Sequence, residues 1–140
     1  AIEFAEENND NFEIFVSLPP TAPLRKSKDI ENCINLLSNK ADIVLTAYKS
    51  NHNPWFNMIS INKNNEVKLL SKTDNFIPNR QKHSNIYNLS TVAYAANKKY
   101  IKKSLNIFEG RVKSLVLPKE RSIDIDDPID LLIARKLLEK

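Results

Sequence analysis

Two aspartates near the end of the chain, Asp124 and Asp126, have the spacing of a cation site. They lie in the segment 118–128, which reads PKERSIDIDDP. Side chains two positions apart share one face of an extended backbone, so the two carboxylates are expected to project together. Magnesium prefers oxygen ligands and is commonly held by one or two carboxylates plus the phosphates of a substrate. The pattern therefore allows a Mg²⁺ site, and it equally allows two solvated acids at the end of a strand.

The residues on either side of these aspartates suggest how they are positioned. Lys119 and Arg121 come just before them, where an anionic substrate would meet positive charge. Asp127 and Asp130 flank a helix start at Pro128, because aspartate is a favoured N-cap and proline a favoured first helical residue. We therefore interpret Asp127 as a helix cap and Asp130 as part of the first helical turn.

Four segments of the chain resemble one enzyme family. The segment 118–130, PKERSIDIDDPID, resembles the C-terminal signature of the acylneuraminate cytidylyltransferases, which include the CMP-sialic acid synthetases and their legionaminic and pseudaminic acid relatives. LPPTAPLR at 18–25 is similar to the family's loop after a central strand, and NPWFNM at 53–58 is a third match. Arg80 and Gln81 open a fourth, which continues through Tyr87 to 90–95. The four segments follow the family's order and cover most of the chain.

This resemblance implies a fold, a reaction and a set of site residues. The fold is α/β, a three-layer nucleotidyltransferase fold with a mixed sheet and flanking helices. The reaction joins CTP and an acidic nine-carbon sugar into the CMP-sugar and pyrophosphate. The resemblance assigns Mg²⁺ to Asp124 and Asp126, and catalytic stabilisation of anions to Arg25 and Arg80. The substrate-binding residues that it implies are Thr21, Arg25, Arg80, Gln81 and Arg121.

Some positions depart from the family's pattern, and they bear on the acceptor sugar. Pro19, Asn88 and the pair at 90–91 differ from the residues usual in the family. All lie where the resemblance places the acceptor, so we expect a relative of N-acetylneuraminic acid such as legionaminic acid. Two alternatives stay open: a cytidylyltransferase for another acidic sugar such as ketodeoxyoctonate, and a non-enzymatic basic domain that binds RNA or another partner.

Composition indicates one folded domain with an anionic ligand. The chain has 140 residues, of which 41% are hydrophobic and 27% charged. Residues 1–16 hold five acids and no base, so the other 124 carry 21 bases against 12 acids, a net +9. Such an excess suits an anionic ligand. There is one glycine, Gly110, and therefore no glycine-rich phosphate loop. We expect residues 1–140 to be the C-terminal portion of a longer enzyme, without its nucleotide-cradling unit and inactive alone.

Cysteine and apolar content exclude several classes of protein. One cysteine and two histidines cannot form an internal disulfide framework or the usual zinc spacings. Cys33 lies on the apolar stripe of a predicted helix, which favours a core position. No apolar run has the length of a membrane span. We expect a cytoplasmic protein with neither a membrane nor a nucleic-acid partner.

Periodicity predicts alternating strands and helices. A strand, a helix and a strand at 12–18, 27–40 and 41–48 predict a right-handed parallel unit. Ser27 and Asn97 are expected to cap helices, and 1–8 to end a helix packed on the sheet. Further strands are predicted at 90–96 and 112–117. The last helix is expected to cover the sheet with Leu131, Leu132, Ala134, Leu137 and Leu138.

The region 49–89 differs in composition from the rest of the chain, and we interpret it as an insertion. Asparagine-rich turns surround short apolar runs at 56–61 and 66–70, which predict a hairpin. We expect this region to serve the sugar side of the site and to form a homodimer contact. The apolar residues expected at that contact are Trp55, Phe56, Met58, Ile59 and Ile61.

Overall fold

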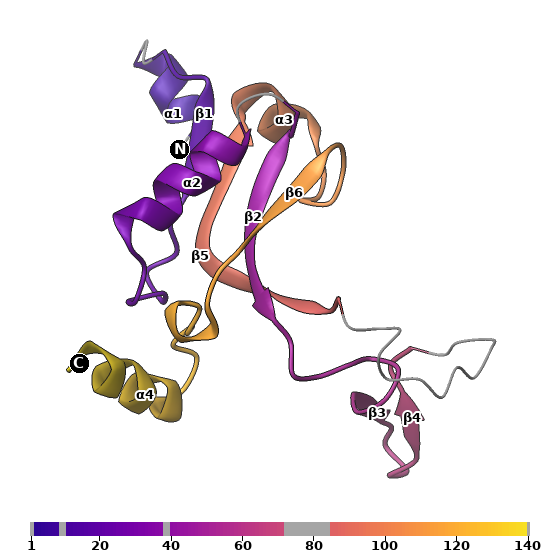
Figure 1. Ribbon diagram of the computed structural model, residues 1–140. Helices are drawn as coiled ribbons and strands as arrows, with labels where there is room; N and C mark the ends of the chain where they lie inside the picture. Colours follow the sequence, from indigo (N-terminus) through magenta and orange to yellow (C-terminus); the bar gives the residue numbers. More distant parts are fainter. Residues whose placement is uncertain (1, 9–10, 38–39, 72–84, 140) are drawn as a thin grey trace. The chain divides into compact units, whose positions relative to one another are not determined.

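The computed structural model describes residues 2–8, 11–37, 40–71 and 85–139, and these form two compact units (Figure 1). The first, here called the sheet unit, comprises Ala1–Tyr48 and Leu89–Lys140. The second, the hairpin unit, comprises Lys49–Asn88. Each is described by itself below.

The sheet unit is built on a four-stranded sheet in the order β1-β5-β2-β6. Its strands are β1 (Ile14–Ser17), β2 (Ile43–Lys49), β5 (Tyr87–Asn97) and β6 (Val112–Val116). β1 pairs with β5 in the antiparallel sense, and β2 pairs with β6 in the parallel sense. β5 is also antiparallel to β2, because the Asn97 N–H donates to the Asp42 carbonyl while the Ala93 N–H reaches the Thr46 hydroxyl further along. β1, β2 and β6 therefore run in one direction.

The predicted mixed sheet is confirmed, with one difference in strand order. β1 and β2 are parallel, as expected from the helix that joins them, but β5 lies between them. The small side chains of Ala93, Ala95 and Ala96 suit this central position, where they are at most 1% exposed. A side chain that small lets helices on both faces approach the sheet closely.

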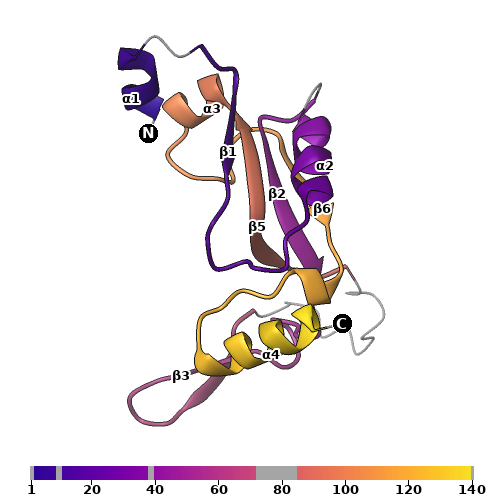
Figure 2. The same cartoon turned by 90° about the vertical axis from the view of Figure 1, so that its left-hand side faces the viewer.

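Helices cover both faces of the sheet (Figures 1 and 2). The helices are α1 (Ile2–Glu7), α2 (Ser27–Leu37), α3 (Lys98–Lys103) and α4 (Pro128–Leu138), with a 3₁₀ turn η2 (Lys119–Arg121) before α4. On one face Cys33 and Leu37 of α2 pack against Val44 of β2 and against Ala93 and Ala95 of β5. On the other face α3 adds Tyr100 and Ile101 to a cluster around Ile43 and Leu45. The fold is thus the predicted three-layer α/β arrangement.

Cys33 confirms its predicted core position. It is fully buried, and its thiol donates weakly toward the Val44 carbonyl at 3.6 Å. Burial raises the pKa of the thiol to about 11, so the thiol stays protonated at neutral pH. It is a packing residue.

The prediction for the last helix is wrong in most of its residues. Of α4 only Ala134 is buried, whereas Leu132 and Leu138 are 63% and 64% exposed and Leu131 is 36% exposed. Both views place α4 beyond the ends of β2 and β6 rather than against a face of the sheet (Figures 1 and 2). The cause is the segment 122–127, which carries the chain past the end of β6 before α4 begins.

Two predicted caps and the first helix also differ in detail. Ser27 is the first residue of α2, and the Asp29 carboxylate accepts from the Lys26 N–H just before it. Asn97 precedes α3 without a side-chain cap, because its amide donates to the Ala41 carbonyl instead. α1 buries no side chain.

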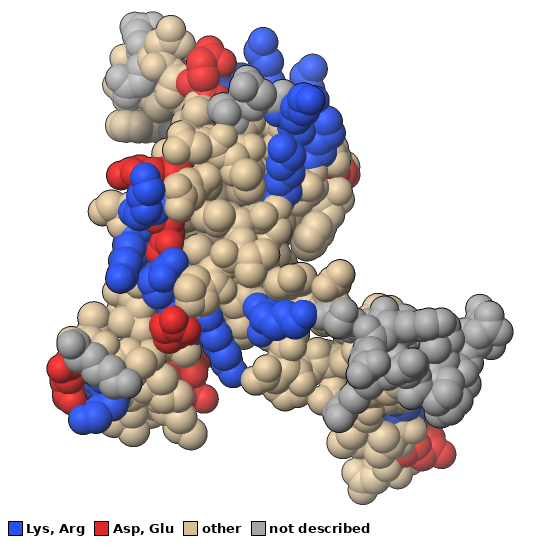
Figure 3. Space-filling model, viewed as in Figure 1, with Lys and Arg blue, Asp and Glu red and all other residues tan. Residues whose placement is uncertain are grey.

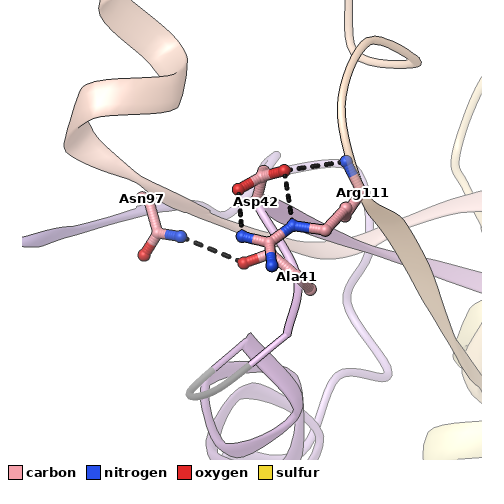
Figure 4. A network of polar contacts seen from close by, with 4 residues as sticks. All are labelled: Ala41, Asp42, Asn97 and Arg111. Atoms are coloured by element: carbon pink, nitrogen blue, oxygen red, sulfur yellow. Dashed lines mark hydrogen bonds and ion pairs between the residues drawn. The ribbon is translucent and has the colours of Figure 1, made fainter.

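A polar network joins the amino-terminal ends of β2 and β6 (Figure 4). The Asp42 carboxylate accepts from the Arg111 backbone N–H at 2.8 Å and from its Nε and Nη2 at 3.1 and 2.9 Å. These bonds lower the pKa of Asp42 to about 2. Gly110 precedes Arg111 with φ +74°, a turn conformation that favours glycine. Gly110 therefore lies at a position where a residue without Cβ is needed.

The hairpin unit contains the predicted hairpin in a shorter form. β3 (Ile59–Ile61) pairs with β4 (Val67–Leu69), so that Ile59 faces Leu69, and Asn65 takes a left-handed φ of 61° in the turn. The run predicted from 56 begins only at Ile59, because 54–57 form a turn in which the Asn53 side chain accepts from the Trp55 N–H.

Candidate metal and substrate site

The carboxyl ends of β1, β2 and β6 lie at one edge of the sheet, together with the start of β5. Ligands of open α/β sheets bind outside this edge. The loop after β1 and the segment after β6 meet here, because the Ile125 N–H donates to the Thr21 carbonyl at 2.9 Å. This backbone bond brings together the two segments that carry the clearest sequence motifs.

Arg25 fixes the loop after β1 to the sheet. Its Nε donates to the Val92 carbonyl of β5, and its Nη2 donates to the Pro19 carbonyl within the same loop. The guanidinium, predicted as a catalytic group, thus satisfies backbone carbonyls in this structure. Two bonds to carbonyls 73 positions apart hold the loop in one conformation.

Arg121 is used in a similar way by the segment after β6. Its Nη2 and Nε contact the Asp29 carboxylate at 2.9 and 3.1 Å, in a paired geometry that matches the planar guanidinium. Asp29 is only 2% exposed and also accepts from the Lys26 N–H. The pair ties η2 to the start of α2.

A cavity of about 420 Å³ lies at the segment after β6 and the start of β5. Asp124, Asp126 and Asp130 line it together with Lys119 and Ser90. Three carboxylates and one ammonium group give its lining a formal charge of −2, which suits a divalent cation. The two aspartates singled out by their spacing therefore lie at one cavity.

Among these lining residues, Asp124 has a carboxylate oxygen that lacks a hydrogen-bond partner among the described residues. This oxygen, Oδ1, is buried. The pKa of Tyr94 is raised, mainly because Tyr94 is partly buried and also because the negative charge of Asp124 acts on it. A buried oxygen without a partner is costly, commonly about 1–3 kcal/mol or more for a charged group. A bound cation would satisfy it.

The other acids at the cavity have different roles. Asp126 is exposed, and neither of its carboxylate oxygens accepts a hydrogen bond from a residue that the structure describes. Asp130 Oδ2 accepts from the N–H groups of Asp126 and Asp127, and Asp127 Oδ1 accepts from those of Ile129 and Asp130. This is a capping box, so the predicted cap at Asp127 and the first-turn role of Asp130 are confirmed.

The donor set fits magnesium better than a metal that needs a full protein cage. Within residues 2–8, 11–37, 40–71 and 85–139, no group of three or more His, Cys, Asp or Glu side chains could hold a metal ion. Asp124 and Asp126 offer two carboxylates, the number that magnesium often takes while substrate phosphates and water complete its shell. The described oxygen atoms thus fit Mg²⁺ held jointly with a substrate.

Sequence reasoning missed the residue that shapes the start of β5. The Thr46 hydroxyl, 0% exposed, donates to the Ser90 carbonyl at 2.9 Å and accepts from the Ala93 N–H at 3.2 Å. It thereby fixes Ser90 at the cavity wall. A threonine within the apolar run of β2 was the available signal. Arg80 and Gln81, both predicted at the site, lie outside the described residues.

Basic side chains gather at another place, over α3 and β6 (Figure 3). Lys98 and Lys102 of α3 are paired with Glu6 of α1 at 2.9 and 3.1 Å. These bonds lower the pKa of the Glu6 carboxyl. Half of the lysines of α3 thus serve to attach α1.

In the part of the chain that the structure describes, no helix is long and apolar enough to cross a membrane.

Comparison with known proteins indicates the family to which the chain is related. No family model matches the chain. The chain is 26% identical over 130 residues to post-translational flagellin modification protein B of Campylobacter coli, covering 92% of this chain and 54% of that protein. It is 30% identical over 95 residues to CMP-N,N'-diacetyllegionaminic acid synthase of Campylobacter jejuni, covering 68% of this chain and 39% of that protein. The chain is a relative of the CMP-nonulosonate cytidylyltransferases. The predicted resemblance is thereby confirmed.

A solved structure supports the fold of this cytidylyltransferase relative. The 4-diphosphocytidyl-2C-methyl-D-erythritol synthase of Anaerococcus prevotii matches with a TM-score of 0.60 at 16% identity, over 98% of this chain and 65% of that one. The match shows a shared nucleotidyltransferase fold. The chain spans about half or less of the length of the two curated relatives.

Proposed function

We propose that this chain forms the metal- and sugar-binding part of a cytidylyltransferase that joins CTP and a nonulosonic acid and releases pyrophosphate. The observation that carries the proposal is the unpartnered Asp124 Oδ1 at a cavity shared with Asp126. The relative named for N,N'-diacetyllegionaminic acid supports a legionaminic-type acceptor. The single, buried and unpaired Cys33 supports a cytoplasmic setting.

The described residues would divide the work between binding and positioning. When bound, Mg²⁺ would neutralise charge that develops on the phosphates during transfer. Asp124 and Asp126 would hold it. Arg25 and Arg121 keep the two segments around the cavity in place through the contacts described above, which favours reactants that are held in line.

Arg80 and Gln81 complete the proposal on the basis of the family resemblance. We assign them to the sugar acid, because the planar fork of arginine binds two carboxylate oxygens at once. Thr21 remains a proposed substrate contact through its side chain, since its carbonyl is used by Ile125.

We also propose that the hairpin unit forms a homodimer contact. Both strands of its hairpin are exposed, and Ile61 and Val67 are 62% and 57% exposed. A two-stranded hairpin is only marginally stable on its own, and exposed apolar residues in a group commonly mark a contact. Sedimentation of the Ile61→Lys variant as a monomer beside a dimeric parent would support this surface. A monomeric parent at micromolar concentration would refute it.

The test of the function compares three aspartates in the enzyme that carries this chain. Asp124→Asn and Asp126→Asn keep the side-chain size but remove a metal ligand's charge. We expect release of pyrophosphate from CTP and legionaminic acid to fall by about a hundredfold or more, with partial recovery at raised Mg²⁺. Asp127→Ala removes only the helix cap, so stability should fall by about 0.5–2 kcal/mol while most activity remains.

The outcomes separate a metal site from a structural turn. Equal loss of activity in all three variants, with the same Mg²⁺ dependence as the parent, would contradict the proposal. Full activity in Asp124→Asn would contradict it as well.

A further inference from the structure

Lys119 and Arg121 are two positions apart, yet their surroundings are opposite. Arg121 is 27% exposed and is held by the buried Asp29 carboxylate. Lys119 is exposed and lines the acidic cavity, and its ammonium group makes no ion pair or hydrogen bond with any residue that the structure describes. Both residues were predicted to face an anionic substrate, and their contacts in the structure separate them.

Arg121 is already paired with a buried carboxylate. Its Nε and Nη2 donate to Asp29, which would keep only the Lys26 N–H as a described partner if the arginine turned away. Breaking such a pair is costly because it leaves an uncompensated buried charge. A substrate would have to offset that cost before gaining anything from Arg121.

Lys119, unlike Arg121, has a charged group that no described residue pairs with. It is the cationic member of a described lining that otherwise carries three carboxylates. Unpaired lysines on a solvated face are common, but this one lines the same cavity as Asp124, whose buried Oδ1 has no hydrogen-bond partner among the described residues. A lysine ammonium is a compact point charge that binds phosphate oxygens well.

We propose that Lys119, and not Arg121, binds a phosphate oxygen of the polyphosphate that enters this cavity together with the cation. The inference rests on the proposed function for the presence of Mg²⁺. It adds a residue that the family resemblance does not assign, and it moves the substrate-binding role from Arg121 to its neighbour. The Lys119 ammonium group would bind the negatively charged phosphate, which the carboxylates of Asp124 and Asp126 repel.

The experiment measures binding rather than turnover. Pyrophosphate is titrated calorimetrically into the chain with Mg²⁺ present, and Mg²⁺ is titrated alone in a second series. Lys119→Met should weaken pyrophosphate binding about tenfold, the usual value of one charge-assisted hydrogen bond. The same variant should bind Mg²⁺ alone a few times more tightly, because a positive charge near the carboxylates is gone.

Two control variants define what counts against the proposal. Arg121→Met should lower the melting temperature, and where the variant is folded it should weaken pyrophosphate binding less than Lys119→Met does. Lys113→Met, on β6, should change neither quantity. No pyrophosphate binding by the parent chain, unchanged binding in Lys119→Met, or equal losses in Lys119→Met and Lys113→Met would each overturn the proposal.

The source of the anionic oxygen is tested with a second probe. N-acetylneuraminic acid carries a carboxylate but no phosphate, and we expect Lys119→Met to leave its binding unchanged. A loss confined to the sugar acid would overturn the assignment to phosphate. These binding results can succeed or fail whatever the turnover of Asp124→Asn, so failure of this inference is distinct from failure of the proposed function.

Discussion

The aspartates at the two ends of the parallel strands differ in their hydrogen bonding. At the amino end Asp42 accepts three hydrogen bonds from Arg111, and its pKa falls to about 2 (Figure 4). At the carboxyl end Asp124 keeps one buried oxygen without a described partner. The first arrangement stabilises the fold. The second leaves free energy to be gained from a ligand, which is how binding sites commonly differ from structural polar networks.

The carboxyl end is not loosely built as a whole. Arg25 and Arg121 are both hydrogen-bonded to fixed partners there, while Asp124 and Lys119 line the cavity. We call Arg25 and Arg121 the frame, because their hydrogen bonds are made within the fold. We call Asp124 and Lys119 the lining, because each keeps a charged group without a described partner. Variants of the frame should change stability, and variants of the lining should change binding.

The largest effect on stability is expected from Arg121→Met. It leaves the Asp29 carboxylate, 2% exposed, with one backbone partner described. We expect the free energy of unfolding to fall by about 3 kcal/mol, at the lower end for broken buried pairs because Arg121 is partly exposed. Chemical denaturation measures it. Lys119→Met, two residues away, should cost less than about 0.5 kcal/mol, and a similar cost for both would erase the distinction between frame and lining.

A smaller effect is expected from Gly110→Ala at the amino end. Gly110 has φ +74°, and an added Cβ would lie 2.9 Å from Asp42 Oδ2 and 3.2 Å from a ring carbon of Tyr100. We expect a loss of about 2 kcal/mol from backbone strain and displacement of the network. Gly110→Asn tolerates the left-handed backbone but keeps the crowding, so it should recover only part of the loss. Neither change should alter Mg²⁺ binding at the other end, and a change there would show that the ends are coupled.

The smallest effect depends on pH and concerns Asp42→Asn. The pKa of Asp42 is lowered from 3.8 to about 2 in the folded protein, mainly by the hydrogen bond from the Arg111 side chain. A lowered carboxyl pKa gives stability that is complete above the unfolded pKa and is lost as pH falls through the folded one. The melting temperature of the parent should exceed that of Asp42→Asn above about pH 4, and the two should converge toward pH 2. A constant difference over that range would mean that the ionised carboxylate is not what stabilises this end.

The sequence was sufficient for features that depend on neighbours in the chain. The helix cap at Asp127, the first-turn position of Asp130 and the core position of Cys33 all follow from local pattern, and all are present. The spacing of Asp124 and Asp126 predicted a shared face, and both do line one cavity.

Features that depend on distant residues were not accessible in this way. Arg121 and Asp29 are 92 positions apart, so nothing near Arg121 indicated that its charge would be used for structure. Asn97 has the type of a helix cap, but the Ala41 carbonyl competes for its amide. The apolar residues of α4 predicted a helix packed on the sheet, and the length of the segment before α4 carries it past the sheet instead.

The most direct test of the account is where a divalent cation binds on this chain. Mn²⁺ replaces Mg²⁺ in oxygen sites and broadens nearby amide signals in nuclear magnetic resonance spectra. We predict early broadening at Asp124, Asp126 and Ser90, reversal by excess Mg²⁺, and loss of the effect in Asp124→Asn, while the signals of Asp42 and Arg111 stay sharp. Broadening that begins at Asp42, or that leaves residues 124–126 unchanged, would contradict the account.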